Sequence, residues 1–458
     1  MRLGIAIQHY DARNDVRDLV ALLSERIDLI LFARPGHLGG FAAPGEVRYF
    51  RRAEARRHWW WSQMFRFFGG IPRSRNNFFI TEASKLALVD PVTRLKAMAA
   101  LRTRMLGPRW LSATKYLERL RGCDATPVED VDGFLFITEY SDPAFLSHVL
   151  ASGKPAWTYL YSWDHACKHT IMPAGVSGYL VWNTELARDM EDLQQVPVNQ
   201  CHPVGATQLA YVKTYLDTPA LREPALPHRY LYFGCATGHL AFALQEVRVI
   251  RFVAEVMAKE LPSHKLVVRP YPMFARMDFF EELRQLPNVA FDEEFMRNRR
   301  DRSLTHQDIY HKLRLQEHAD AFIHLGTTMG FEGAYLDTPI LFLDLEDFNY
   351  GRPRRDLLHL RQFIHQYHNE RYMLQDGYPN VVRRTGDLAA AVRGAVRCRG
   401  DYLRYNRAIS GLTPLRSLEA IADAVLQRCG MPAGGARAGG AGTARPAAVT
   451  TEAGRGLD

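Results

Sequence analysis

Short apolar runs alternate with amphipathic stretches along most of the chain. In the N-terminal half, apolar runs at residues 2–10, 28–34, 132–138, 155–162 and 177–183 predict strands. Between them lie stretches such as residues 12–27, which carry apolar residues at helical spacing. Strands that alternate with helices in this way form a parallel sheet with crossover helices. The N-terminal half therefore predicts an α/β domain.

A second series of the same kind begins after a polar, proline-rich stretch. Its predicted strands lie at residues 229–238, 265–272, 288–294, 320–326 and 339–347, and a helical region runs from residue 386 to about residue 429. We expect an N-terminal Rossmann-like domain at 1–217, a linker at 218–228, a C-terminal Rossmann-like domain at 229–430 and a disordered Gly/Ala/Pro-rich tail at 431–458. Two such domains place a cleft between the carboxyl ends of their sheets, where ligands bind.

Composition fits this organisation. The 458 residues are too many for one ordinary core, and 47% hydrophobic and 24% charged residues are typical of a soluble globular protein. We recognise no signal peptide and no apolar stretch of roughly 18 residues that could span a bilayer. The six cysteines lie far apart, without metal-ligand spacing. These features predict a cytoplasmic protein without a disulfide scaffold or a structural zinc.

Basic and aromatic residues crowd one segment of the N-terminal half. The formal net charge is +8, and the region from Arg48 to Arg75 holds much of the excess. Its arginines are Arg48, Arg51, Arg52, Arg56, Arg57, Arg66, Arg73 and Arg75, interleaved with Trp59, Trp60, Trp61, Phe65, Phe67 and Phe68. We expect a helical insertion that packs its aromatic residues on its own domain, or one that contacts an anionic membrane surface or a lipid-linked acceptor. No nucleic-acid-binding module is recognisable, so we expect no nucleic acid partner.

Two strand-to-helix turns of the second series carry candidate donor-binding residues. In "YFGCATGHL", small residues at Gly234, Thr237 and Gly238 allow close backbone approach, and the helix start offers N–H groups to an anion; an ordinary βα turn is the alternative. In "VVRPYP", Arg269 ends a strand on a rigid proline support and is placed for a phosphate oxygen. Its alternative role is a surface salt bridge.

A third turn, within "FIHLGTTMGFEGAYLDTPILFLDLED", is the most informative. Gly326, Thr327 and Thr328 end an apolar run and would place hydroxyl and N–H groups at a helix N-terminus. Glu332 follows Thr328 by four residues, so it lies one turn further along the same side of that helix. Its carboxylate could accept hydrogen bonds from ribose or sugar hydroxyls, or could stabilise the first helical turn.

These motifs resemble the nucleotide-sugar-binding half of GT-B glycosyltransferases, especially bacterial surface-polysaccharide and CDP-glycerol-type transferases. The resemblance is carried by Thr327, Thr328, Glu332 and the strand restart at Thr338-Pro339. Arg269-Pro270-Tyr271-Pro272 is similar to the family's Arg/Lys-Pro-His-Pro, with Tyr271 in place of the histidine. In the N-terminal half, "YLYSWDHACKHTIMPAGVSGYLVWNTELARDM" and "VGA" at residues 204–206 resemble the same group. The resemblance implies two Rossmann-like domains facing a cleft.

Sugar transfer at such a cleft needs a base for the acceptor hydroxyl and stabilisation of the leaving phosphate. Asp164 is the favoured base because it follows a predicted strand, with His165 and Glu139 as second choices. No DxD pair with metal-site character follows a strand, so we expect no metal and no cofactor, with the nucleotide sugar as substrate. The predicted function is transfer of a sugar to a surface-polysaccharide or lipid-linked glycan at the inner face of the membrane. The alternatives are a sugar-nucleotide 2-epimerase, a glycerophosphotransferase or a non-catalytic binding protein.

Overall fold

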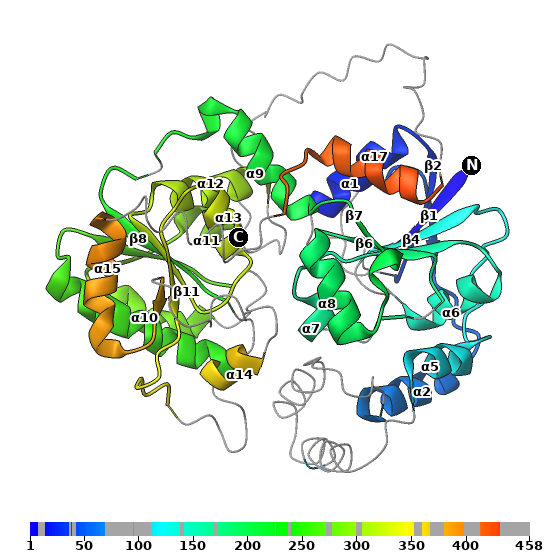
Figure 1. Cartoon of the computed structure of the whole chain (residues 1–458), viewed down its shortest axis with the longest axis horizontal. Helices are drawn as coiled ribbons and strands as arrows, with labels where there is room; N and C mark the ends of the chain where they lie inside the picture. The colour runs from blue at the N-terminus through cyan, green and yellow to red at the C-terminus, as the bar shows by residue number, and fades with distance from the viewer. Residues whose placement is uncertain are drawn as a thin grey trace, which may run out of the picture.

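The computed structural model describes residues 1–7, 14–35, 38, 43–68, 95, 111–137, 142–168, 172–173, 175–224, 226–236, 240–271, 277–298, 305–351, 360–366, 380–397 and 413–430. Two parallel sheets form its two lobes, and helices cover each of them (Figure 1). None of the described helices is both long and apolar enough to cross a membrane.

The first sheet has seven strands in the order β3-β2-β1-β4-β5-β6-β7, and all its pairings are parallel. The strands are β1 (Arg2–Ala6), β2 (Asp28–Ala33), β3 (Glu46–Tyr49), β4 (Gly133–Ile137), β5 (Ala156–Tyr159), β6 (Gly178–Val181) and β7 (Cys201–Pro203). The helices that follow them include α1 (Asn14–Ser24), α6 (Pro143–Ala151), α7 (His165–Lys168), α8 (Thr184–Gln194) and α9 (Thr207–Asp217). The strand order reverses between β1 and β4, as in a Rossmann sheet.

The second sheet has the order β10-β9-β8-β11-β12-β13 and is also parallel throughout. Its strands are β8 (Tyr230–Gly234), β9 (Lys265–Arg269), β10 (Val289–Phe291), β11 (Ala321–His324), β12 (Ile340–Leu343) and β13 (Val381–Val382). Its helices include α10 (Leu240–Glu260), α11 (Glu293–Asn298), α12 (His306–His318), α13 (Met329–Tyr335), α14 (Leu360–Gln366) and α15 (Leu388–Arg397). The predicted fold class, two Rossmann-like α/β domains, is confirmed.

The interior of the first sheet is filled by aromatic residues. Phe145 of α6 stacks on Phe32 of β2, with ring centroids 4.8 Å apart, and packs edge-on against Phe134 of β4 at 5.9 Å. Gly4 of β1 leaves the room for this packing, because a Cβ atom there would lie 2.7 Å from a ring carbon of Phe134. Asp142 begins α6 by accepting hydrogen bonds from two of its first amides, and Pro143 occupies the first turn.

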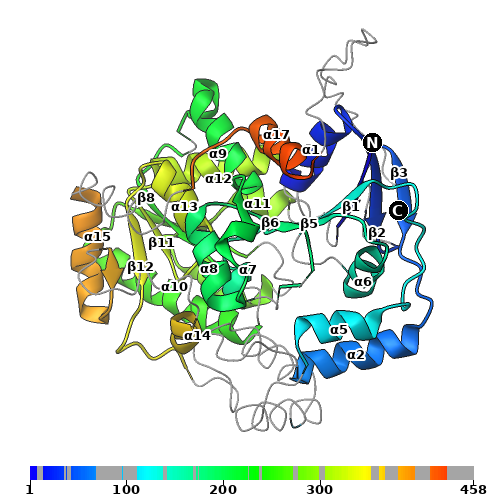
Figure 2. The same cartoon turned by 45° about the vertical axis from the view of Figure 1, so that its right-hand side comes forward.

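The last described helix returns to the first domain. In α17 (Leu418–Arg428), Ile421 and Val425 are fully buried in the same core as Val16 and Leu19 of α1. Figure 1 and Figure 2 both place the red α17 beside the blue α1. The prediction had assigned every residue up to 430 to the C-terminal domain. That assignment is wrong for α17, because its apolar face is complementary to α1. The other domain boundaries stay predictions, and the predicted tail lies outside the described residues.

Part of the basic-aromatic region forms α2 (Ala55–Phe68), which packs against α5 (Ala113–Leu120) beside the first sheet (Figure 2). Phe65 stacks on Tyr116 with ring centroids 4.1 Å apart. Trp59 and Trp60, in contrast, are 61% and 54% exposed. The expected helical insertion is therefore present, and it packs only some of its aromatic residues inward. The side chain of Arg66, and Arg73 and Arg75 altogether, lie outside the description.

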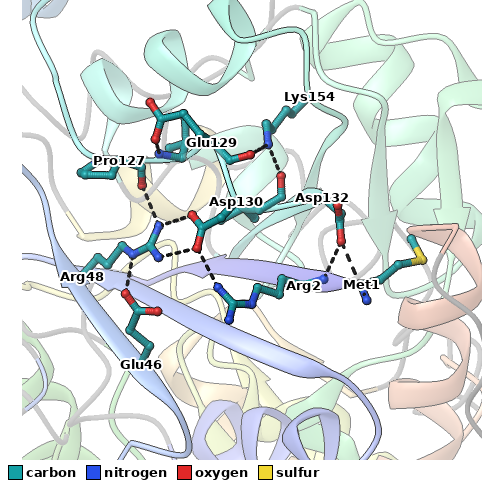
Figure 3. A network of polar contacts seen from close by, with 11 residues as sticks. Met1, Arg2, Glu46, Arg48, Pro127, Glu129, Asp130, Asp132 and Lys154 are labelled. Carbon is teal, nitrogen blue, oxygen red and sulfur yellow. Dashed lines mark hydrogen bonds and ion pairs between the residues drawn. The ribbon is translucent and has the colours of Figure 1, made fainter.

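Several arginines of this region have structural partners. Arg48 lies in β3 and bonds to Glu46, Asp130 and the carbonyl of Pro127 (Figure 3). The hydrogen bonds from Arg48 hold the pKa of Asp130 well below its usual range. Arg52 pairs with the buried carboxylates of Asp124 and Asp142. Arg48 therefore ties β3 to the segment before β4, and Arg52 ties the segment before α2 to the residues that follow α5 and precede α6. Neither arginine adds to a free basic surface.

Candidate functional site

Residues that follow strands of both sheets meet at one point between the domains. Trp163, which follows β5, donates its indole N–H to the hydroxyl of Thr328, which follows β11, over 3.3 Å. The same indole packs edge-on against Phe331 of α13, with centroids 4.4 Å apart. The carboxyl ends of parallel strands are the edge of a sheet where ligands bind. The structure thus brings together two segments that the sequence predicted separately as acceptor-side and donor-side motifs.

The predicted acceptor-side residues lie next to this contact. Asp164 and His165 follow Trp163 directly and are 7% and 5% exposed. Asp164 directly precedes α7, which begins at His165, and the Asp164 carbonyl accepts a hydrogen bond from the amide of Cys167. Glu139 lies outside the described residues. Asp164 and His165 therefore share the interdomain position, whereas nothing places Glu139.

The donor-side turn is held by a residue that sequence reasoning missed. His324, the last residue of β11, is fully buried, and its Nδ1 accepts hydrogen bonds from the amides of Gly326 and Thr327 at 3.0 and 3.3 Å. Burial lowers the pKa of His324 to about 3, so the ring is neutral and its proton resides on Nε2. Gly326 has φ +105°, a left-handed conformation that glycine adopts easily.

This geometry changes the expected phosphate seat. The amides of Gly326 and Thr327 are already bonded to His324, so they are not the free donors that the sequence suggested. Thr328, at the N-cap of α13, makes no side-chain capping bond, and its hydroxyl faces Trp163 instead. The hydroxyl groups at this turn are those of Thr328 and of Thr327, which accepts a long hydrogen bond of 3.5 Å from the amide of Met329. The signal in the sequence was a lone histidine that ends an apolar strand just before the turn.

Glu332 lies one turn into α13, and its side chain is 7% exposed. One carboxylate oxygen, Oε1, accepts a hydrogen bond from Lys312 of α12 at 2.6 Å. The other, Oε2, is buried and has no hydrogen-bond partner among the described residues. An unpaired buried carboxylate oxygen is costly, about 1–3 kcal/mol or more, unless a ligand or water supplies a donor. This oxygen is thus an acceptor that a hydroxyl group could satisfy.

Arg269 differs most from its expected role. Its guanidinium is 3% exposed and pairs with Asp292 at 2.6 Å and with Asp308 at 2.7 Å, and both carboxylates are fully buried. The ring of Phe295 lies 4.3 Å from its central carbon. The expectation of a phosphate contact is not supported by this geometry, since the donors are directed to two aspartates. The alternative expectation was a surface salt bridge, but the observed ion pairs are buried.

The first glycine turn is only partly described. Gly234 ends β8, and a Cβ atom there would lie 2.7 Å from the ring of Phe322 and 3.1 Å from the sulfur of Met329. The absence of a side chain at Gly234 therefore lets β8, β11 and α13 pack closely together. Thr237 and Gly238 lie outside the described residues, so their expected contact with an anion stays a prediction.

One helix supplies several of the partners that the sequence did not reveal. Asp308, Lys312 and Gln316 recur every four residues of α12 and so lie on one face. They contact Arg269 at the end of β9, Glu332 of α13 and the carbonyl of Met329, respectively. This spacing is visible in the sequence, but it is also typical of a solvated helix. No group of three or more His, Cys, Asp or Glu side chains in the described part of the chain is arranged to hold a metal ion.

The fold is that of a two-domain Rossmann-like protein in which two strand-end segments meet between the domains. Similar solved structures include S. aureus MnaA with UDP, at 10% identity and a TM-score of 0.49, covering 94% of this chain and 97% of that one. The wall teichoic acid polymerase TagF is similar at 8% identity and a TM-score of 0.47, covering 94% and 88%. A UDP-GlcNAc 2-epimerase from Methanocaldococcus jannaschii is similar at 10% identity and a TM-score of 0.45, covering 86% and 93%. No family model and no curated protein sequence matches the chain.

Proposed function

We propose that the chain is a glycosyltransferase of the GT-B type that uses a nucleotide-sugar donor. The observation that carries this proposal is the 3.3 Å contact between Trp163 and Thr328, because it joins the strand-end segments of the two domains at one place. A donor held by one domain and an acceptor held by the other would meet there. Proximity of two bound reactants is what a transfer reaction requires.

On the donor side, Glu332 is proposed to accept a hydrogen bond from a hydroxyl of the nucleoside or sugar through Oε2. Lys312 keeps that carboxylate oriented by holding Oε1. Thr328 offers a hydroxyl to the diphosphate. Arg269 has a supporting role, because its ion pair with Asp308 connects the end of β9 to α12, the helix that carries Lys312.

On the acceptor side, Asp164 is proposed as the general base that takes the proton of the acceptor hydroxyl. Its position beside Trp163 supports this role, and adjacent His165 is the second choice. A positioned base of this kind contributes about 10²–10⁴-fold to the rate. Asp164→Asn should therefore lower kcat by about that factor and leave nucleotide affinity within about twofold.

The donor assignment is tested by titrating the purified chain with CMP, CDP, UDP, GDP and their sugars in a calorimeter. One nucleotide should bind, and Glu332→Ala should weaken that binding about 10- to 100-fold, the equivalent of one charge-assisted hydrogen bond. Glu223→Ala, at an exposed glutamate of the predicted linker, is the matched control and should bind normally. A folded wild-type chain that binds none of these compounds would overturn the donor assignment.

The reaction class is tested by product analysis with and without an acceptor. A transferase consumes the donor only when a glycan or lipid-linked acceptor is present. Conversion of the donor sugar without any acceptor would identify an epimerase instead, and release of CMP from a CDP-alcohol would identify a glycerophosphotransferase. Nucleotide binding without turnover in either assay would identify a binding protein.

We further propose that the protein acts in the cytoplasm at the inner membrane surface, through α2. Trp59 and Trp60 are exposed on this helix, and Arg51 and Arg56 are exposed near them. Tryptophan and arginine together suit the interface of an anionic bilayer. Sedimentation with vesicles of phosphatidylglycerol should capture the wild type, and Trp59→Ser/Trp60→Ser should lose most of that binding. Equal sedimentation of the double variant would refute this role for α2.

A further inference from the structure

A cluster of three polar side chains joins the two domains away from the Trp163 contact. His306, the first residue of α12, places Nε2 2.7 Å from Oδ2 of Asp18 on α1. Tyr211 of α9 donates its hydroxyl to the same Oδ2 at 2.6 Å. The rings of Tyr211 and His306 pack edge-on, with centroids 5.6 Å apart. One carboxylate oxygen therefore receives donors from both sides of the domain boundary.

One member of the cluster, His306, lies on the helix that also supports the candidate donor-binding residues. The helix α1 leads away from the carboxyl end of β1, and α12 begins after β10 and α11, so both helices begin on the ligand-binding edges of their sheets. Two residues beyond His306, Asp308 holds Arg269 at the end of β9. A change in the contact between His306 and Asp18 would therefore move the helix that supports the donor side.

We propose that Asp18, Tyr211 and His306 form a proton-controlled clasp, which strengthens the contact between α1 and the start of α12 when His306 is protonated and weakens that contact when it is neutral. A charged imidazolium attracts the Asp18 carboxylate, whereas a neutral imidazole offers it only a hydrogen bond. This inference concerns domain geometry, and it stands or falls independently of the proposed reaction.

The pKa shifts of His306 and Asp18 both favour the ion pair between them. The hydrogen bond to Asp18 raises the pKa of His306 above its ordinary 6.5, although burial opposes the shift. Burial alone would raise the pKa of Asp18, but bonds from His306 and Tyr211 outweigh it and the net direction is downward from 3.8. The other charged or titratable groups that act on the cluster are Arg17 and Asp15 on α1 and Tyr310 on α12.

The directions of the two pKa shifts determine how the attraction between His306 and Asp18 changes with pH. A raised histidine pKa means that the attraction is fully present below pH 6.5 and is lost as the pH rises through the higher value in the folded protein. A lowered aspartate pKa means that the attraction is lost only as the pH falls through a value below 3.8. The clasp is therefore closed in mildly acidic solution and loosens in alkaline solution.

Amide hydrogen exchange of the protein without any ligand measures how firmly the start of α12 is held. The amide of Ile309, which donates to the carbonyl of Thr305, reports opening of the first turn of α12. After correction for the intrinsic pH dependence of exchange, its protection in the full chain should fall about two- to fivefold between pH 6 and pH 9, as expected for a partly exposed ion pair. His306→Gln should abolish this pH dependence and show the low protection throughout.

Two further variants keep the test decisive. His318→Gln removes a histidine at the opposite end of the same helix, where it bonds the carbonyl of Arg222, and should keep the wild-type pH dependence. Tyr211→Phe retains the ring and removes one donor to Asp18, so His306 should hold its proton to a higher pH and the transition should move upward. Protection that is independent of pH in the wild type, or a pH dependence that survives His306→Gln, would overturn the proposal.

Discussion

Replacement of Arg269 separates its structural role from the ligand role that the sequence suggested. The side chain lies between Asp292 and Asp308, and all three groups are buried. Arg269→Met removes the cation and retains most of the apolar stem, so two buried carboxylates lose the guanidinium that they share. Breaking a buried ion pair from one side costs about 3–5 kcal/mol, because an uncompensated charge stays behind.

The expected loss can be expressed as a shift in Tm. The predicted C-terminal domain has about 200 residues, and for this size each kcal/mol corresponds to about 2–4 °C. Arg269→Met should therefore lower the melting temperature of this domain by about 6–20 °C. Adding Asp308→Asn should recover part of the loss, since the amide carries no charge.

The sequence provides a way to assign the transition to one domain. All seven tryptophans lie within the first 182 residues, and only Trp163 and Trp182 have a ring contact with the described part of the second domain, at Phe331. Fluorescence therefore reports mainly the first domain and this contact, whereas far-ultraviolet circular dichroism reports both domains. The dichroism transition should shift much more than the fluorescence transition. Arg229→Met is the control, because Arg229 makes an exposed pair with Asp320, and it should cost less than about 1 kcal/mol. An Arg269→Met chain as stable as the wild type that no longer binds nucleotide would refute the structural role and restore the expected phosphate contact.

Substitutions at three further positions test local features. His324→Leu should cost about 1–3 kcal/mol in urea unfolding because two amides lose their acceptor, whereas His324→Asn retains an acceptor and should cost less. Because the pKa of His324 is lowered to about 3, stability should fall as the pH drops below 6.5, and His324→Asn should flatten that slope; an unchanged slope would contradict the assigned neutral ring. Gly4→Ala should lose about 1–3 kcal/mol through its clash with Phe134, and a neutral result would mean that the ring can move. Tyr159→Phe should lose about 1–2 kcal/mol, since the amide of Thr207 then has no acceptor; equal thermal stability would argue against that bond.

The sequence predicted the sheets well because parallel strands are buried on both faces. All five residues of β4 and of β8 are buried, and such runs stand out as continuous apolar segments. The edge strands β3, β7 and β13 were missed, since they are short and, in β3, all four residues are half-buried or exposed. The sequence could not predict which domain α17 packs against either, because the pattern of an amphipathic helix does not show what covers its apolar face.

The candidate site stays a prediction, although the structure shows where some of its residues lie. The turn at Thr328 and the segment at Asp164 were found from local patterns, and the contact through Trp163 brings them together. The ion pair of Arg269 with Asp308 joins residues 39 positions apart, which only the tertiary fold brings into contact. An arginine at a strand end looks the same in sequence whether it faces a ligand or a buried carboxylate.

The return of α17 to the first domain has a consequence for how the chain is made. During synthesis, the first domain emerges early, but the part of α1 that packs against α17 stays uncovered until residues 418–428 have left the ribosome. The second domain can complete its own sheet before then. The domain that is translated first is therefore finished last, and a nascent chain that stalls before α17 would present an unfinished core to chaperones and proteases.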